Sequence, residues 1–155
     1  MEHYDSNSIF KTTIDKLIDY INENFDMSSI DYISGGERRD WPFSIPVAYL
    51  LGKPHITIYK DLSTVVSTCD FEEATAVTNL KDKHVLHVAD LLNFGSSFER
   101  AWKPAISTLG SKLTWSLSVV NRNPKIGTQV LENLDIVPHS LITLDETFFN
   151  IAKTK

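Results

Sequence analysis

The sequence predicts an α/β protein in which helices cover both faces of a central parallel sheet. Short apolar runs rich in β-branched residues have the length of buried strands, and segments with helical spacing of apolar residues alternate with them. This alternation is typical of parallel sheets, whose strands are joined by helical crossovers. The chain has 155 residues, 42% of them hydrophobic, which is enough for one domain with a core and short for two. We therefore expect residues 1–155 to form a single domain.

The N-terminal segment 1–28 is expected to hold an amphipathic helix. Apolar side chains recur there at helical spacing among polar ones, namely Phe10, Ile14, Leu17, Ile18, Ile21 and Phe25. A short strand at 30–34 follows and leads into 35–41, a turn whose two glycines permit positive φ. A second helix is expected to begin near Ser44 and to end at Gly52.

The next strand is expected at 55–59, where β-branched residues alternate with others. Residues 60–80 are expected to form a mobile insertion. Within this insertion, 64–68 fits one strand of a hairpin arm, whereas 72–79 fits either a helix or a strand.

The stretch 85–97 carries the most specific pattern of the chain. An apolar strand ends at the acid Asp90, a small polar turn follows, and helical spacing begins after Ser97. In such a unit the N–H groups of the loop and the positive end of the helix point to one place. We therefore expect this loop to bind a phosphate.

Three polar loops are expected to meet at one edge of the sheet. Beyond the central unit the pattern predicts strands and helices in alternation: a strand at 113–120, a helix at 127–133, a strand at 137–143 and a closing helix at 144–152. In parallel sheets, ligands bind beyond the carboxyl ends of the strands. The loops 35–41, 89–97 and 121–126 all follow strands, so the sequence places the ligand site among them.

The charge of the chain favours a small anionic ligand over a polymer. With 15 basic and 20 acidic residues the formal net charge is −5, which argues against a nucleic-acid partner bound by phosphate neutralisation. Arg38, Arg39 and Arg122 are isolated positive charges that suit a small anion. No apolar run is long enough to span a bilayer, and the N-terminus lacks a signal-peptide pattern, so we expect a cytoplasmic protein with no membrane partner. The single cysteine, Cys69, has no partner for an internal disulfide.

Residues 85–97 are similar to the phosphoribosyl diphosphate (PRPP) signature of the type I phosphoribosyltransferase family. In that signature an apolar strand leads to an acidic pair, two apolar residues, two threonines, a glycine, a small residue and then Ser or Thr. The matching residues here are Asp90, Leu91, Leu92, Gly95 and Ser97. Downstream, 119–122, Gly127 and 137–145 resemble the pattern of the orotate phosphoribosyltransferase branch of the family. The resemblance covers most of the chain and implies the type I phosphoribosyltransferase fold.

The resemblance also implies an activity, that of a transferase of pyrimidine biosynthesis. Such an enzyme transfers the phosphoribosyl group of PRPP to orotate or a related base and releases pyrophosphate. Asp90 would be the catalytic carboxylate, which holds the ribose diol while positive charge develops on the sugar ring. The ribose phosphate would lie on Asn93, Phe94, Gly95, Ser96 and Ser97.

The same resemblance assigns the groups that would face the leaving pyrophosphate and the base. Pyrophosphate would be bound by Gly35, Gly36, Glu37, Arg38, Arg39 and Lys60. Arg122 would face the carboxylate of an orotate-like base through paired hydrogen bonds. Magnesium is the implied cofactor, held mainly by PRPP and not by metal ligands of the protein, because the charge of pyrophosphate grows as it leaves. A homodimer is implied by the family's habit of sharing loops between subunits.

Several positions depart from the family pattern and leave a second function open. Ala89 replaces the first acid of the pair, and Asn93 and Phe94 replace the two threonines. The segment 60–70 offers only Lys60 in place of the lysines and the His-Gly of the family's mobile loop. The alternative is a catalytically degenerate protein of the same fold that binds a nucleotide or PRPP for regulation.

Structural roles also stay open for several polar and aromatic residues. The charged run 37–40 fits a solvated surface ion-pair cluster as well as a pyrophosphate site. His87 lies in the middle of an apolar strand, where a hydrogen-bonded core histidine is the more common case. Trp102 is interpreted as a packing residue.

Overall fold

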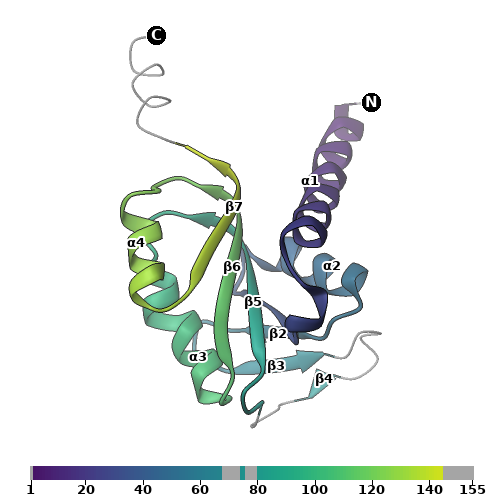
Figure 1. Cartoon of the computed structure of the whole chain (residues 1–155). Coiled ribbons are helices and arrows are strands. Elements are labelled where there is room, and N and C mark those ends of the chain that lie inside the picture. The colour runs from purple at the N-terminus through teal and green to yellow at the C-terminus, as the bar shows by residue number, and fades with distance from the viewer. Residues whose placement is uncertain (1, 68–73, 76–79, 145–155) are drawn as a thin grey trace.

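The computed structural model describes residues 2–67, 74–75 and 80–144, which build one seven-stranded sheet with helices on both faces (Figure 1). The strand order is β4-β3-β2-β1-β5-β6-β7. The strands are β1 (Tyr32–Gly36), β2 (His55–Ile58), β3 (Thr64–Ser67), β4 (Ala74–Thr75), β5 (His84–Leu92), β6 (Lys112–Asn121) and β7 (Val137–Thr143). The neighbours along the order β2-β1-β5-β6-β7 pair in parallel, whereas the β2–β3 and β3–β4 pairs at one edge are antiparallel. The predicted α/β class is confirmed.

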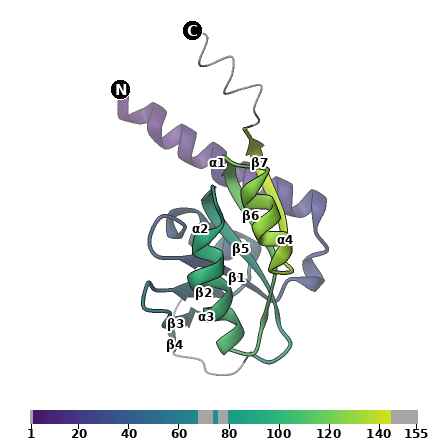
Figure 2. The same ribbon diagram turned by 90° about the vertical axis from the view of Figure 1, so that its left-hand side faces the viewer.

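Two apolar cores lie on the two faces of the sheet. The helices are α1 (Glu2–Asn24), α2 (Trp41–Leu51), α3 (Lys103–Thr108) and α4 (Ile126–Asn133), with a 3-10 turn η1 (Met27–Ser29) and a π-helical turn η2 (Phe98–Trp102). One core joins α1 and α2 to the sheet, and the other joins η2, α3 and α4 to its opposite face. Figure 1 shows α1 and α2 on one side of the strands and α3 and α4 on the other, and Figure 2 looks onto the face that α3 and α4 cover. Strand β5 serves both cores, because Val85 and Ala89 face one of them while Leu86 and Val88 face the other.

The turn expected at 35–41 differs from the structure. Gly35 and Gly36 are the last residues of β1, and neither has positive φ. They are small because of close packing: a Cβ on Gly35 would overlap Ser44, and one on Gly36 would overlap the ring of Trp102. Helix α2 also begins earlier than expected, at Trp41, whereas its expected end is confirmed by a left-handed Gly52 with φ of 68°.

Strand β5 is longer than the sequence indicated. It continues past Asp90, since Leu91 and Leu92 still pair with Val120 and Asn121 of β6. Asp90 is therefore held by the sheet itself, and the irregular loop is short.

The remaining expected elements fall into two groups. The hairpin arm is confirmed, because β3 pairs antiparallel with β2, and β7 has the expected bounds. Apart from β4, the segment expected at 72–79 and the closing helix expected after Leu144 lie outside the described residues. Among the helices that the structure describes, none has the length and apolarity that crossing a membrane would need.

Candidate functional site

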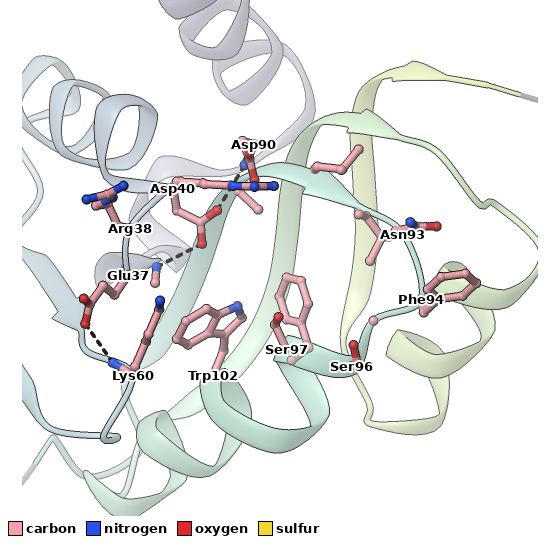
Figure 3. Close-up of a pocket in the computed structure, with 17 residues that line it drawn as sticks. Glu37, Arg38, Asp40, Lys60, Asp90, Asn93, Phe94, Ser96, Ser97 and Trp102 are labelled. Atoms are coloured by element: carbon pink, nitrogen blue, oxygen red, sulfur yellow. Dashed lines mark hydrogen bonds between the residues drawn. The ribbon is translucent and has the colours of Figure 1, made fainter.

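A cavity of about 740 Å³ opens beyond the carboxyl ends of β1 and β5 (Figure 3). Its walls come from the β1–α2 loop, from Lys60 after β2, from the end of β5 with the loop that follows, and from η2. The lining residues are Gly36, Glu37, Arg38, Arg39, Asp40, Lys60, Ala89, Asp90, Leu91, Leu92, Asn93, Phe94, Gly95, Ser96, Ser97, Phe98 and Trp102. Two of the three loops expected to converge, 35–41 and 89–97, therefore share one cavity.

The loop after β5 is fixed by close packing against α4. Gly95 has φ of 74°, which favours glycine, and an added Cβ would lie 2.9 Å from Val130. A Cβ on Gly127 would overlap the carbonyl oxygen of Asn93. The backbone of the loop is thus closely packed on a fixed support, which suits an anion site formed by backbone N–H groups.

The side chains of this loop differ in what they offer to a ligand. Ser96 and Ser97 both line the cavity, and Ser97 makes no side-chain bond to cap the helical segment that follows it. Phe94 also lines the cavity and is 56% exposed. The hydroxyls of the two serines therefore supply the polar side-chain groups at the start of this helix, while Phe94 offers only its backbone N–H as a donor.

The opposite wall carries positive charge. Arg38, Arg39 and Lys60 are exposed and line the cavity. Glu37 accepts a hydrogen bond from the backbone N–H of Lys60 at 3.0 Å, which ties the β1–α2 loop to the residue after β2. The peptide bond between Glu37 and Arg38 is cis. Gly35, in contrast, lies below this wall and does not line the cavity.

Asp40 is a site residue that the sequence did not reveal. It is only 5% exposed, so the solvated ion-pair interpretation of 37–40 is wrong for this residue. One carboxylate oxygen, Oδ2, accepts the N–H of Gly36 at 2.9 Å and the Nε2–H of His87 at 2.8 Å. The other, Oδ1, accepts the N–H of Asp90 at 3.1 Å (Figure 3). The side-chain partner of this carboxylate is therefore the ring of His87.

His87 is the hydrogen-bonded core histidine that its place in the strand predicts. It is fully buried, and its Nδ1 lies 2.8 Å from the hydroxyl oxygen of Ser34. Its ring is nearly parallel to that of Trp102, with 5.8 Å between the centroids. Trp102 is 8% exposed and lines the cavity, so it is more than the packing residue that was expected.

A second buried histidine lies beside this network. The Nε2 of His55 is 2.9 Å from the hydroxyl oxygen of Ser44, and its Nδ1 is 2.9 Å from that of Thr57. Burial, together with the smaller effect of the nearby His87, lowers the pKa of His55 to about 3 against the opposing charge of Asp40. His55 is therefore neutral near pH 7.

Asp90 is the half-buried carboxylate of the cavity. Burial raises the pKa of the Asp90 carboxyl above its usual value, and the negative charge of Asp40 raises it further. The N–H of Leu91 and the guanidinium of Arg39 act in the opposite direction on this pKa. Asp90 is thus influenced by the negative charge of Asp40 and by the positive charge of Arg39 on the facing loop.

Arg122 does not reach this cavity. Its side chain is exposed at the end of β6, and its backbone N–H donates to the carbonyl of Leu92 at 2.8 Å. The third loop therefore braces the end of β5, but the cavity lining does not include the arginine expected to bind the base. Asn121 is buried and bonds Thr128, which gives it a structural role.

The described residues hold no cluster of three or more His, Cys, Asp or Glu side chains that would bind a metal ion. Only Asp90 and Glu37 offer partly exposed carboxylates to the cavity. This donor set fits a metal that arrives with a phosphorylated ligand, because Mg²⁺ commonly takes one or two carboxylates together with substrate phosphates.

Solved structures of phosphoribosyltransferases share this fold. Adenine phosphoribosyltransferase from Thermoanaerobacter pseudethanolicus superposes with a TM-score of 0.68 at 23% identity, covering 91% of this chain and 83% of that one. Orotate phosphoribosyltransferase from Aeropyrum pernix gives 0.69 at 17% identity, covering 95% and 77%. The fold and the cavity at its strand ends thus define a phosphoribosyltransferase-like α/β protein.

Sequence similarity then identifies the family. The chain is 30% identical over 139 residues to adenine phosphoribosyltransferase from Nitrosomonas eutropha, covering 83% of this chain and 79% of that protein. No family model matches the chain. The identity to this relative and its coverage nevertheless show that the chain belongs to the type I phosphoribosyltransferase family. Because the sequence relative is an adenine enzyme, the expected affiliation with the orotate branch is not confirmed.

Proposed function

We propose that this protein transfers the phosphoribosyl group of PRPP to a nucleobase and releases pyrophosphate. The observation that carries the proposal is a single cavity. Asp90 and the loop 93–97, called the phosphate loop from here on, lie on one side of it, and Arg38 and Arg39 lie on the other. The two walls match the two charged ends of PRPP, with the sugar between them.

Each wall has a separate task in this reaction. Asp90 would accept hydrogen bonds from the ribose diol and balance the positive charge that develops on the sugar ring as the bond to pyrophosphate breaks. Arg38, Arg39 and Lys60 would stabilise the growing negative charge of the leaving pyrophosphate. Magnesium bound to PRPP would add positive charge at the same place. Asn93 to Ser97 would hold the 5-phosphate, mainly through backbone N–H groups and the two serine hydroxyls.

We propose adenine as the first acceptor to test and orotate as the second. Adenine is favoured by the sequence relative, which is named for that base. Orotate is favoured by the pattern at the end of β6, yet Arg122, the residue expected to recognise its carboxylate, does not line the cavity. Adenine, which has no carboxylate, does not require this arginine.

The test is pyrophosphate release from PRPP and Mg²⁺ with a panel of bases that includes adenine and orotate. We expect turnover with one base, identification of its nucleotide by mass spectrometry, and a loss of at least a hundredfold in Asp90→Asn, because the lost charge acts in the transition state. Turnover with orotate alone would show that the adenine assignment is wrong. Folded protein that is inactive with every base would contradict the transferase proposal.

A regulatory binding protein is the second candidate, and specific residues favour it. Ala89 and Phe94 remove a carboxylate and a hydroxyl that the PRPP signature carries, while the cavity is retained. This candidate predicts a thermal shift with PRPP or a nucleotide that Asp90→Asn weakens, without turnover of any base. The absence of a shift with every phosphorylated ligand would contradict both candidates.

We also propose that the protein works as a homodimer. Helix α1 projects from the sheet in Figure 1 and exposes two apolar side chains, Ile9 at 68% and Phe10 at 43%. Light scattering should give about twice the chain mass of 17.5 kDa, and a monomer mass at micromolar concentration would contradict this proposal.

A further inference from the structure

Asp40 receives three hydrogen bonds that join both walls of the cavity. The N–H of Gly36 belongs to the strand end from which the arginine loop begins, and the N–H of Asp90 belongs to β5. The Asp90 donor lies 50 positions from Asp40 along the chain, whereas the Gly36 donor lies only 4 positions away. A single buried carboxylate therefore fixes the arginine loop relative to the carboxylate that faces the ribose.

The Asp40 carboxylate is itself held from below. Its Oδ2 pairs with the Nε2–H of His87, whose Nδ1 meets the hydroxyl of Ser34 on β1. All three residues of this hydrogen-bonded series are buried, with Ser34 and His87 at 0% exposure. Buried, fully bonded polar networks have little freedom to rearrange, so the carboxylate is aimed at Asp90 and not at solvent.

Asp40 also lies beside the side chain of Ala89. His87 and Ala89 are two positions apart in β5, so both project from the same face of the sheet. Because Asp40 bonds the ring of His87 on that face and the N–H of Asp90 next to Ala89, its carboxylate lies on the face toward which a longer side chain at position 89 would point.

We infer that Asp40 is a positioning residue of the site, which orients Asp90 and supplies from the β1–α2 loop the second negative charge that β5 lacks at Ala89. This inference rests on the proposed use of PRPP as ligand. Asp40 acts on Asp90 in two ways. It accepts the backbone N–H of Asp90, and its negative charge raises the pKa of the Asp90 carboxyl. Its removal is expected to loosen Asp90 and the arginine loop together.

The first experiment compares Asp40→Asn with Asp26→Asn in PRPP binding measured by calorimetry with Mg²⁺. Asn has the shape of Asp but replaces the Oδ2 acceptor with a donor, so the bond from the Gly36 N–H is lost and His87 must change tautomer. We expect the PRPP dissociation constant to rise about tenfold to a hundredfold in Asp40→Asn. Asp26 is an exposed cap of η1 where Asn serves equally well, so Asp26→Asn should bind PRPP like the wild type. Wild-type affinity in Asp40→Asn would overturn the inference.

The second experiment separates a positioning role from a merely structural one. Ala89→Asp is introduced into the wild type and into Asp40→Asn. In the wild type it adds a third carboxylate beside Asp40 and Asp90 and should lower the urea midpoint. In Asp40→Asn the loss should be smaller, and PRPP affinity should recover at least severalfold, because the charge is restored from β5. Additive effects on stability with no recovery of affinity would overturn the inference.

The coupling between the effects of Asp40→Asn and Ala89→Asp on stability is measured without ligand. It can therefore be tested even if the proposed use of PRPP is wrong. A wild type that fails to bind PRPP would contradict the proposed function, whereas the coupling between positions 40 and 89 still tests where Asp40 acts. If Asp40→Asn does not fold, His87→Gln serves as the second variant, since it removes the ring that holds Asp40. We expect a severalfold rise of the PRPP dissociation constant in His87→Gln, and an unchanged value would overturn the inference.

Discussion

Asp90 combines a functional position with an environment that disfavours its charge. Burial and the neighbouring Asp40 raise its pKa, so the folded state binds a proton more tightly than the unfolded chain does. For an acid with a raised pKa, the native state gains stability as the pH falls and loses it as the pH rises through the folded pKa. At pH 7 the ionised Asp90 therefore lowers the free energy of unfolding.

Asp90→Asn should consequently stabilise the protein at pH 7. Because Asp90 is only partly buried and solvent screens its charge, we expect a gain of less than about 1 kcal/mol. Urea unfolding at pH 7 and at pH 3.5 checks this expectation, since the gain should shrink at the lower pH, where Asp90 is already neutral. A variant that is less stable than the wild type at pH 7 would show that the charge is well compensated.

His55 has the opposite effect on the pH dependence of stability. Its pKa falls from an ordinary value near 6.5 to about 3 on folding. Between these pH values the unfolded chain therefore binds a proton on His55 and the folded protein does not. The stability contributed by neutral His55 is complete above pH 6.5 and is lost as the pH falls toward 3.

His55→Gln should flatten the acid side of the stability profile. Through this residue, the free energy of unfolding of the wild type is expected to fall by up to a few kcal/mol between pH 6.5 and 3. The variant should not show this part of the decrease. Chemical denaturation of both proteins at pH 8 and pH 5 measures the difference, and the values at pH 8 are the control for the lost hydrogen bonds to Ser44 and Thr57. An equal loss in both proteins between these pH values would contradict the assignment.

At the scale of single elements, the phosphate loop depends on the helix packed against it. A Cβ on Gly127, in the first turn of α4, would overlap the carbonyl oxygen of Asn93. The helix and the loop must then move apart, and overpacking of this kind costs about 1–3 kcal/mol. Gly127→Ala is therefore predicted to lower both the unfolding free energy and the affinity for PRPP.

Gly52→Ala is the matched control for this change. Gly52 ends α2 with φ of 68°, and an added Cβ there would meet nothing within 4 Å. The substitution should cost about 1 kcal/mol of stability through backbone strain, while PRPP affinity measured by calorimetry stays at the wild-type value. Equal effects of the two alanine variants on PRPP affinity would contradict the role of α4.

The same loop shows what the sequence can predict and what it cannot. Residues 85–97 form a strand, a turn and a helix because of contacts with near neighbours, and this local pattern was readable. Even so, the sequence pattern places the end of β5 too early, since the pairing of Leu91 and Leu92 depends on β6. Asp40 gave no local signal, because its partners His87 and Asp90 are 47 and 50 positions away. The lone histidine in an apolar strand was the one sign of a buried polar partner.

Arg122 illustrates the limit in the other direction. Its position after a strand indicates correctly that it lies at the edge of the sheet where β5 ends, because its backbone N–H bonds the carbonyl of Leu92. The direction of its side chain depends on packing in the folded protein, which no spacing along the chain describes. The edge of the sheet at which a loop lies is thus predictable from pattern, whereas the composition of the cavity is a tertiary property.

At the scale of the whole molecule, the two cores are joined by the strands they share. Side chains of β5 alternate between the core under α1 and α2 and the core under η2, α3 and α4, and β6 contributes Leu117 to the first and Leu113 to the second. Neither core can lose its helices without exposing one face of the same strands. The expectation of a single domain, which stays a prediction, therefore becomes a prediction of one cooperative unfolding transition.

Two tryptophans allow this prediction to be measured core by core. Trp102 belongs to the core under η2 and α3, whereas Trp115 packs against the core under α1 and α2. In one variant Trp41 and Trp115 are replaced by Phe, and in the other Trp41 and Trp102 are, so that each protein reports on one core. Within each variant, tryptophan fluorescence and far-ultraviolet circular dichroism should give the same urea midpoint, since both cores open together. A fluorescence midpoint below the dichroism midpoint in either variant would show that the core it reports unfolds separately, and the sheet would then divide the chain into two units.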